Sequence, residues 1–156
     1  MEKIAVFAGS FCPFTKGHED IVRKALTLFD KVIIAIGHNF NKKDLFSIED
    51  RQDWIEKLYL GIPAVIVLPY TGLTVDFCKK TGANYLVRGL RNPLDFMQEQ
   101  ELAQVNRQLN PDVETVFLLA SPGYEIVSSS LVRELWSHGA DYTPYVSYKL
   151  PEYSTK

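Results

Sequence analysis

Residues suited to phosphate binding gather first between an apolar run and a helical pattern near the N-terminus. This loop reads G-S-F-C-P-F-T-K-G-H at residues 9–18. Glycine at position 9 permits a tight turn, and Gly17 lets the backbone approach a ligand where the next helix begins. A helix N-terminus offers free N–H groups and a partial positive charge, so phosphate can bind beside His18 and the Thr15 hydroxyl. A plain strand-to-helix loop with a histidine cap is the alternative that this segment leaves open.

A second cluster, R-G-L-R at residues 88–91, follows a short apolar run. Two guanidinium groups at the end of a strand, with a glycine between them, suit bidentate binding of phosphate oxygens. The alternative is two solvated arginines, Arg88 and Arg91, that pair with Asp95 or Glu99. A salt bridge is expected of Asp95 in preference to metal binding.

Two further polar clusters also follow apolar runs. Lys42 and Lys43 stand in a polar loop, where lysines are ordinarily just solvated. The run S-S-S at residues 128–130 opens a helical pattern, and three serines exceed what capping requires. A serine hydrolase is disfavoured because no G-x-S-x-G sequence is present. The chain also has neither a G-x-G-x-x-G fingerprint nor a P-loop, which disfavours a dinucleotide oxidoreductase.

Together these clusters contribute one histidine, two arginines, one or two lysines and a serine run, with no evident activated nucleophile. Positioning and charge neutralisation do most of the work in phosphoryl and nucleotidyl transfer, so the set indicates that reaction class. The two cysteines, Cys12 and Cys78, have no spacing suited to a metal site. They indicate a reducing, cytoplasmic setting.

Apolar runs and helical patterns alternate along the chain and must position these clusters. Strands are expected over residues 3–7, 31–36, 64–68, 85–87 and 113–119, and helices over residues 18–29, 47–60, 73–80, 95–109 and 128–138. The alternation predicts an α/β fold, with a single Rossmann-like domain over residues 1–156, a five-stranded parallel sheet and helices on both faces. Ligands bind such sheets at the carboxyl ends of the strands, where the polar clusters fall. A tyrosine-rich tail begins at about residue 141.

Composition excludes several classes of protein. The 156 residues are 46% apolar and 23% charged, and 17 Lys and Arg stand against 19 Asp and Glu for a net charge of -2. These values are ordinary for one globular domain. They give no overall attraction to nucleic acid or to an acidic membrane, so neither partner is expected. The apolar runs are far shorter than the roughly 20 residues that span a bilayer.

The chain resembles the bacterial phosphopantetheine adenylyltransferases, a family of the nucleotidyltransferase superfamily that carries a (T/H)-x-G-H motif. The resemblance extends to about Pro144. It covers G-S-F-C-P-F-T-K-G-H at 9–18, K-K at 42–43, R-G-L-R at 88–91, D-F at 95–96 and V-S-S-S-L-V-R-E at 127–134. T-x-G-H alone indicates only the superfamily, and its combination with the other segments indicates the family.

The resemblance implies that ATP reacts with 4′-phosphopantetheine to give dephospho-coenzyme A and pyrophosphate. It implies Mg²⁺ as cofactor, with no protein metal ligands assigned, and feedback inhibition by coenzyme A in the same site. Members of the family are typically homohexamers, built as dimers of trimers. Trp136 and the tyrosine-rich tail are expected to expose apolar surface for such an assembly.

The resemblance also assigns roles to individual residues. His18 matches the histidine that stabilises the transition state at the α-phosphate, and Lys42 and Arg88 match the residues that hold the acceptor phosphate. Ser10 stands where the family binds substrate, and Thr74 at a position that contacts the pantetheine arm. The positions implied to bind ATP are Ser10, Phe11, His18, Gly89, Leu90, Arg91, Glu99, Tyr124, Glu125, Ile126, Val127, Ser128, Ser129 and Ser130.

Three positions depart from the family's pattern. Cys12 stands where the family usually has Asp, so the hydrogen bonds of that carboxylate are missing. Ala8 replaces a common proline, which is a milder change in loop stiffness. The tail over residues 141–156 is unusually rich in tyrosine and leaves the usual C-terminal packing open.

Rival functions come from two classes. Nicotinate-mononucleotide adenylyltransferases and glycerol-phosphate cytidylyltransferases are enzymes of the same superfamily, and they usually have His where Thr15 stands. A nucleotide-binding module without catalysis belongs to another class. Such a module is expected to lack His18 or Arg91, and both are present.

Overall fold

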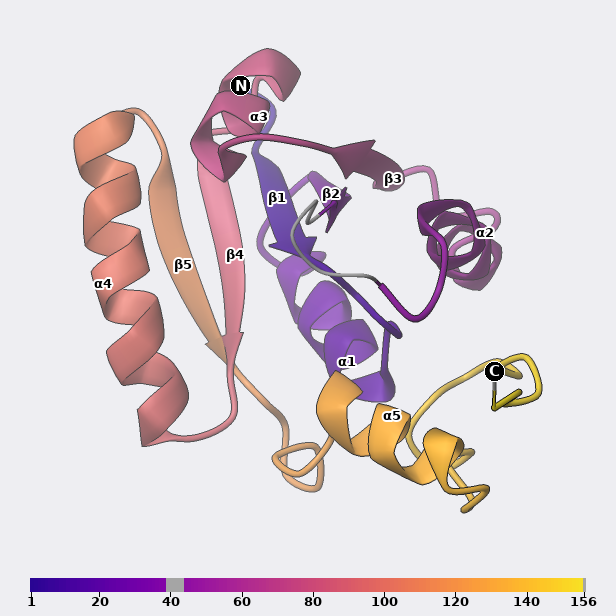
Figure 1. The fold of residues 1–156 in the computed structure, drawn as a ribbon. Coiled ribbons are helices and arrows are strands. Elements are labelled where there is room, and N and C mark those ends of the chain that lie inside the picture. The colour runs from indigo at the N-terminus through magenta and orange to yellow at the C-terminus, as the bar shows by residue number, and fades with distance from the viewer. Residues whose placement is uncertain (39–43, 156) are drawn as a thin grey trace.

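The computed structural model describes residues 1–38 and 44–155, and in these ranges five strands alternate with five helices (Figure 1). The strands are β1 (Ile4–Gly9), β2 (Lys31–Gly37), β3 (Val65–Tyr70), β4 (Tyr85–Leu90) and β5 (Glu114–Leu119). The helices are α1 (Lys16–Ala25), α2 (Ile48–Leu58), α3 (Thr74–Thr81), α4 (Pro93–Leu109) and α5 (Ser129–Ser137). The strands form one all-parallel sheet in the order β3-β2-β1-β4-β5, so the predicted fold class is confirmed.

Apolar side chains cover both faces of the central strands. On one face, Phe7 of β1 and Ile34 of β2 belong to a buried cluster that includes residues of α1 and α2. On the other face, Val6 and Ile33 pack in a cluster with Cys78 of α3. α4 runs beside β4 and β5 (Figure 1). The continuous apolar runs of β1 and β2 follow from this burial on two sides.

β1 and β4 part before their ends, and the sheet opens between them. Pairing of the two strands ends at Phe7 and Val87. Beyond these residues β1 stays paired with β2 as far as Gly9, and β4 stays paired with β5 as far as Leu90. The strand order reverses at this point, so the parted carboxyl ends form the crevice in which sheets of this kind bind ligands.

Two helix ends differ from the sequence-based expectation for local reasons. α1 ends at Ala25 instead of Phe29, because the N–H groups of Thr27 and Leu28 bond to carbonyls three residues back and tighten the last turn. α4 begins at Pro93 instead of Asp95. Asn92 caps this helix by accepting the Asp95 N–H at 3.0 Å, and proline is well suited to the first helical position.

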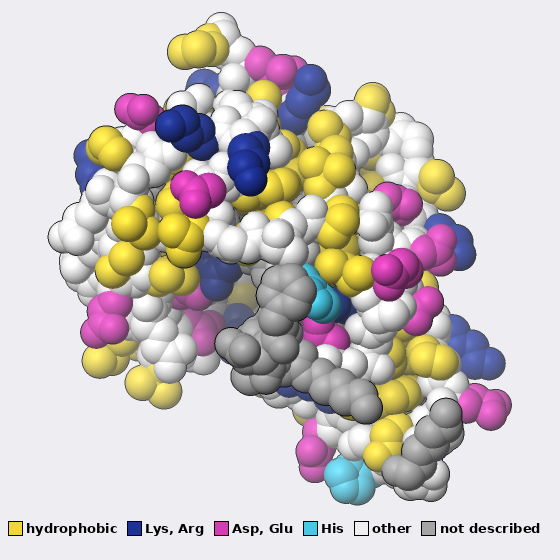
Figure 2. Space-filling view, turned by 45° about the horizontal axis from the view of Figure 1, so that its top comes forward, with side chains coloured by type: hydrophobic (Ala, Val, Ile, Leu, Met, Phe, Trp, Pro, Cys, Tyr) yellow, Lys and Arg dark blue, Asp and Glu magenta, His cyan; other side chains and the backbone are white. Residues whose placement is uncertain are grey.

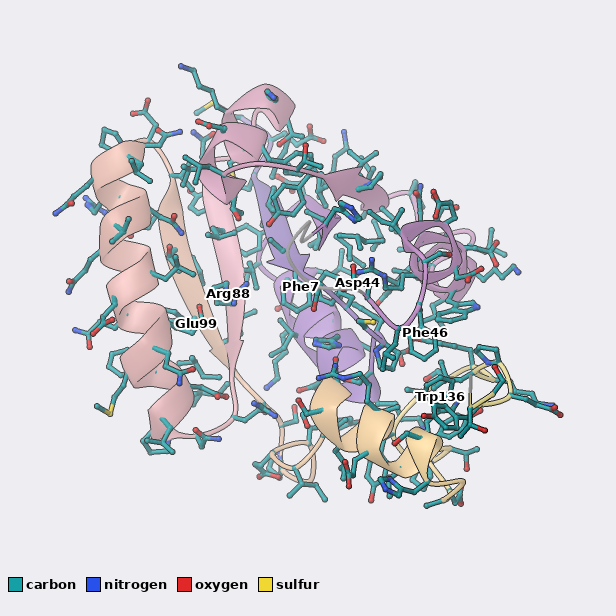
Figure 3. All side chains as sticks on the ribbon, in the orientation of Figure 1. Phe7, Asp44, Phe46, Arg88, Glu99 and Trp136 are labelled. Carbon is teal, nitrogen blue, oxygen red and sulfur yellow. The ribbon has the colours of Figure 1, made fainter. Side chains whose placement is uncertain are left out.

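The C-terminal tail packs on its own chain. Trp136 of α5 is only 9% exposed and forms a third buried cluster with residues that include Phe46 and Val146. The Phe46 and Trp136 rings lie 4.9 Å apart, between the start of α2 and α5 (Figure 3). The expectation of exposed apolar surface is therefore wrong for Trp136, Tyr142 and Tyr148, which pack in or against this cluster, while Tyr153 is 45% exposed.

Exposed apolar side chains instead line the outer side of α4. Five of them, each at least 47% exposed, are Leu94, Met97, Leu102, Val105 and Leu109. Their spacing of three to five residues places them along one stripe of the helix. Figure 2 shows hydrophobic side chains at the surface on the left of the molecule, where Figure 1 places α4. Among the described residues, no helix combines the length and the hydropathy needed to cross a membrane.

Candidate active site

A cavity of about 400 Å³ occupies the crevice between the parted ends of β1 and β4. This volume suits a small-molecule ligand. The predicted site residues that line it are Ser10, Phe11, His18, Arg88, Gly89, Leu90, Arg91, Glu99, Tyr124, Val127, Ser128, Ser129 and Ser130. Clusters that are far apart in the sequence therefore meet at one place.

A few predicted residues stand apart from this cavity. Thr74 begins α3, and its hydroxyl lies 2.9 Å from that of Tyr70, outside the cavity lining. Glu125 and Ile126 are exposed in the loop before α5 and do not line the cavity either. Lys42 lies outside the described residues.

Hydrogen bonds hold His18 in a defined tautomer. The backbone N–H of Thr15 donates to Nδ1 of His18 at 2.9 Å, and the Thr15 hydroxyl lies 3.1 Å from the same nitrogen. A backbone N–H can only donate, so Nδ1 is unprotonated and the neutral ring carries its proton on Nε2. The Thr15 hydroxyl in turn accepts the His18 N–H, which completes a capping box at the start of α1. The histidine cap that the sequence left open is present, and it uses Nδ1, so Nε2 stays available to the cavity.

Burial among aromatic rings keeps His18 uncharged. Phe14 stacks on the imidazole at 5.2 Å between ring centres, and Phe11 meets it edge-on at 5.0 Å. This burial, together with the positive charges of Arg91 and Arg88, lowers the pKa of His18 from 6.5 to about 3. At neutral pH the side chain is therefore a hydrogen-bond donor through Nε2.

Arg51 of α2 anchors one end of the segment at residues 10–15, hereafter the His18 loop. Its guanidinium donates to the carbonyl of Ser10 and pairs with Asp44 at 2.8 Å. Arg51 is only 1% exposed, so removal of its partner would leave a buried charge without compensation. Sequence reasoning missed this residue, because it lies on an ordinary helix far along the chain from the loop.

α5 anchors the middle of the His18 loop. Arg133 donates to the carbonyl of Cys12 at 2.8 Å, and Ser129 donates to that of Pro13 at 2.7 Å. Ser128 caps the helix. The serine run therefore does more than capping, because one of its hydroxyls fixes the backbone of the loop that presents His18.

The Cys12 side chain is buried, at 5% exposure, in the cluster that contains Phe46 and Trp136. An apolar contact thus stands where the family usually has a carboxylate. The backbone of this position remains held by Arg133, so the loop keeps an anchor there.

Two glycines near the cavity allow close contacts within the chain. A Cβ at Gly9 would lie 3.0 Å from the Phe11 ring, and one at Gly17 would lie 3.3 Å from the Val127 carbonyl. Neither glycine has a positive φ. Gly9 therefore makes room for the Phe11 ring, where the sequence predicted a tight turn, and Gly17 lets the segment before α5 approach α1.

Arg88 bridges the parted strands. Its guanidinium donates to both carboxylate oxygens of Glu99 on α4, at 2.7 and 2.6 Å, and to the carbonyl of Ala8 on β1 at 2.7 Å (Figure 3). These bonds use three of the five N–H groups of an arginine, which leaves two for a ligand. The ion pair that the sequence offered as an alternative to phosphate binding is present, and it fixes Arg88 at the cavity.

Two other arginines add positive charge to the cavity. Arg91 pairs with Asp95 at 3.1 Å, as the sequence predicted for this carboxylate. Arg133 bonds to the Ser130 hydroxyl at 3.1 Å and has no carboxylate partner in the part of the chain that the structure describes. Sequence reasoning assigned Arg133 no role. Its spacing of four residues from Ser129 was a usable signal, because such residues share a helix face.

A buried carboxylate fixes the segment that leads from β5 to the serine run. Asp20 of α1, 4% exposed, accepts hydrogen bonds from the N–H of Ser121 at 2.9 Å and from its hydroxyl at 2.8 Å. Arg23 also donates to Asp20. α1 therefore supports the cavity twice, since it carries His18 near its start and holds this segment through Asp20, two residues later.

The residues of the cavity suit a metal ion that binds through the phosphates of a substrate better than a metal ion that is bound by protein side chains alone. Over residues 1–38 and 44–155, no group of three or more His, Cys, Asp or Glu side chains is placed to hold a metal. The two carboxylates of the cavity, Asp95 and Glu99, pair with arginines. Mg²⁺ commonly keeps several waters and binds through substrate phosphates, which requires no such group.

Fold and site together define a class of protein. A parallel α/β sheet that presents a histidine donor and several arginines at its switch point is organised for nucleotidyl transfer. The cytidylyltransferase-like family model matches residues 6–135. A bifunctional NMN adenylyltransferase/ADP ribose pyrophosphatase from Francisella tularensis has the same fold, with a TM-score of 0.71 and 22% identity over 94% of this chain and 45% of that one.

Curated relatives narrow the class. The phosphopantetheine adenylyltransferase of Cytophaga hutchinsonii is 48% identical over 150 residues, which are 96% of this chain and 100% of that protein. The phosphopantetheine adenylyltransferase of Porphyromonas gingivalis is 52% identical over 151 residues, or 97% and 95% of the two chains. This chain belongs to the phosphopantetheine adenylyltransferase family of nucleotidyltransferases, which confirms the resemblance of its motifs.

Proposed function

We propose that this chain transfers the adenylyl group of ATP to 4′-phosphopantetheine, giving dephospho-coenzyme A and pyrophosphate. The proposal rests on the neutral His18 imidazole, whose Nε2 carries the proton, in a cavity that also contains Arg88, Arg91 and Arg133. The family indicates the two substrates. An oxygen of the acceptor phosphate attacks the α-phosphorus of ATP, and the bond from that phosphorus to the oxygen of the leaving pyrophosphate breaks.

His18 acts as a fixed hydrogen-bond donor in this step. Negative charge grows on the oxygens around the α-phosphorus as it becomes five-coordinate, and a donor at a helix N-terminus is suited to meet that charge. A pKa of about 3 keeps the imidazole neutral, with its proton on Nε2, throughout the physiological range. The acceptor phosphate is already an oxygen nucleophile, so the reaction needs no covalent adenylyl-enzyme.

The acceptor phosphate is proposed to bind on the side of Arg88. Beyond its bonds to Glu99 and β1, this guanidinium has two N–H groups left for a dianion. Lys42 supplies a second cation and Ser10 a hydroxyl. Thr74 contacts the pantetheine arm, which extends out of the cavity along the carboxyl edge of the sheet toward the start of α3.

ATP is proposed to bind along residues 89–91 and 124–130, with Ser10 and Phe11 completing its site. Arg91 and the serine run both line this cavity. Both oxygens of Glu99 are bonded to Arg88, so Glu99 serves the site by holding that guanidinium. Mg²⁺ is proposed to enter on the phosphates of ATP, where it neutralises part of their charge.

Assembly and regulation are proposed on the same basis. The exposed apolar stripe of α4 supports a homo-oligomer, for which the family resemblance indicates a hexamer. Coenzyme A contains the pantetheine arm and an adenylyl group, so it is proposed to occupy this cavity as a feedback inhibitor. A cytoplasmic location, without a membrane or nucleic-acid partner, fits the composition of the chain.

A direct screen of substrates tests the proposed function. The chain is incubated with Mg²⁺ and either ATP or CTP, and with 4′-phosphopantetheine, nicotinate mononucleotide or glycerol 3-phosphate as acceptor. Dephospho-coenzyme A formed from ATP and 4′-phosphopantetheine, with the other five pairs near background, is the expected result. A preference for another pair would assign the chain to a different transferase, and no transfer in any pair would favour a binding module.

A further inference from the structure

The tail, residues 141–155, makes one contact to the His18 loop and one to the first residue of α1, and the proposed mechanism uses neither. The Tyr148 hydroxyl donates to the carbonyl of Phe14 at 2.6 Å. The N–H of Lys16 donates to the carbonyl of Tyr145 at 2.8 Å. These bonds hold the backbone on both sides of Thr15, the residue that caps α1.

One peptide group connects Tyr148 to His18. The carbonyl of Phe14 accepts the Tyr148 hydroxyl, and the N–H of the same peptide group, on Thr15, donates to Nδ1 of His18. The C=O and N–H of a trans peptide point in opposite directions, so the tyrosine and the histidine bind its two ends. Hydrogen bonds in such a chain polarise one another, so the bond to the carbonyl strengthens the N–H as a donor.

The surroundings of Tyr148 suit a permanent donor. Its ring is half-buried and stacks on Trp54 of α2, with 5.4 Å between ring centres. Burial raises the pKa of the Tyr148 phenol above its ordinary value, so the hydroxyl remains protonated at working pH. The ring that stacks directly on His18 belongs to Phe14, whose carbonyl Tyr148 holds. Tyr148 therefore restrains both the stacking ring and the hydrogen bond that sets the imidazole tautomer.

We propose that Tyr148 is a positioning residue for adenylyl transfer, which acts through the Phe14–Thr15 peptide group to fix the orientation and tautomer of His18. The effect on rate rests on the proposed function, because it needs His18 as the donor to the α-phosphate. The effect on the imidazole itself is independent of that function. The tail thus contributes to the chemistry of the site as well as to the packing of the third buried cluster.

Tyr148→Phe tests the proposal, with Tyr142→Phe as the matched control. Tyr142 is also half-buried in the tail, but among the described residues its hydroxyl bonds only to the backbone of Leu150, at 3.0 Å from the N–H and 3.4 Å from the carbonyl. Tyr148→Phe is expected to lower kcat roughly two- to tenfold, the effect of losing one hydrogen bond, with the KM of both substrates unchanged. Each of the two variants loses one hydroxyl group, so their melting temperatures are expected to fall by similar amounts. Tyr142→Phe is expected to leave kcat unchanged.

Nitrogen NMR of the imidazoles provides a readout that a merely structural role would not move. The chain has three histidines, so the ring nitrogens of His18 can be assigned by elimination with a His18 variant. In the wild type Nδ1 is expected to be unprotonated and Nε2 protonated. Tyr148→Phe is expected to shift the Nδ1 resonance, and Tyr142→Phe is expected to leave it in place.

The outcomes separate cleanly. An unchanged Nδ1 resonance and an unchanged kcat in Tyr148→Phe would overturn the proposal, even if the variant melts earlier. Should this variant not fold, 3-fluorotyrosine at position 148 keeps the ring and supplies a more acidic hydroxyl. It is expected to shift the Nδ1 resonance and keep kcat at or above the wild-type value, and no shift would overturn the proposal. If the wild type transfers no adenylyl group, the proposed function fails, while the NMR comparison still decides the role of Tyr148.

Discussion

Replacing His18 with asparagine separates the two hydrogen-bonding functions of the imidazole. Nδ1 is the acceptor that caps α1, and Nε2–H is the donor that faces the cavity. In the wild type the Thr15 N–H donates to Nδ1 of His18 at 2.9 Å. The side-chain oxygen of asparagine can occupy the position of Nδ1 and accept the same N–H. Asparagine is too short to place a donor where Nε2–H lies. Glutamine is the usual capping-box residue at this position, so its side-chain oxygen can also accept the Thr15 N–H. Both variants therefore keep an acceptor for the Thr15 N–H and lose the imidazole donor, whereas alanine loses both.

The expected magnitudes differ enough to decide the question. Loss of one preorganised donor to a developing oxyanion costs about 10² to 10³ in kcat, so His18→Asn is expected to fall by that factor while its melting temperature stays close to wild type. Loss of a helix cap costs about 1 kcal/mol of stability, so His18→Ala is expected to melt earlier than His18→Asn and His18→Gln. His18→Ala removes both functions and should show both losses.

Single-turnover rates and melting curves on the same preparations provide the assay. Enzyme in excess over ATP, with saturating 4′-phosphopantetheine, reports the chemical step without product release. Substrate Kd values are expected to change only a few-fold in all three variants. Near-wild-type single-turnover rates in His18→Asn would refute the donor role and leave His18 as a helix cap. A trapped AMP–protein adduct in the wild type would refute the direct transfer.

Three further predictions follow from the site and the surface. Arg88→Ala is expected to raise the KM for 4′-phosphopantetheine at least roughly tenfold, with little effect on ATP binding. Glu99→Gln keeps the arginine and should have a smaller effect. Equal acceptor affinity in Arg88→Ala and in the wild type would count against the assignment of Arg88 to the acceptor phosphate. The pKa of His18 in the folded protein, about 3, lies below its ordinary value of 6.5. The neutral imidazole therefore contributes to the free energy of unfolding above pH 6.5, and this contribution is lost as the pH falls toward 3. NMR resonances of the His18 ring should stay fixed from pH 8 to 5, and a titration near pH 6.5 would contradict this. Leu102→Glu and Val105→Glu place charges on the exposed stripe of α4 and are expected to split the oligomer in light scattering while the chain stays folded; a wild-type monomer at micromolar concentration would contradict the assembly.

The fold and the position of the site were accessible from the sequence for a physical reason. Strands buried on two faces, such as Lys31–Gly37, leave continuous apolar runs, and parallel connections place their carboxyl ends at one edge. Polar clusters that follow those runs must then meet, as His18 and Arg88 do. What the sequence could not indicate is that β1 and β4 part beyond Phe7 and Val87, because strand separation depends on side chains from several elements.

The partners of individual residues were harder to predict. Arg88 was expected either to bind phosphate or to form an ion pair, and the structure places it in an ion pair with Glu99 while leaving two N–H groups. Arg51 and Tyr148 support the His18 loop over long sequence separations and carry no local motif. The sequence predicts exposed aromatic residues in the tail, but Tyr142 and Tyr148 pack against the cluster that contains Trp136, which no periodicity within the tail reveals.

Release of pyrophosphate from ATP, measured with 4′-phosphopantetheine and with unphosphorylated pantetheine, tests the central claim most directly. The acceptor phosphate is the proposed nucleophile and the group that Arg88 holds, so pantetheine lacks both the attacking oxygen and the charge that binds it. Rapid pyrophosphate release, with equal formation of dephospho-coenzyme A, is expected for the phosphorylated acceptor, and background release is expected for pantetheine. Equal release with both acceptors, or none with 4′-phosphopantetheine, would contradict it.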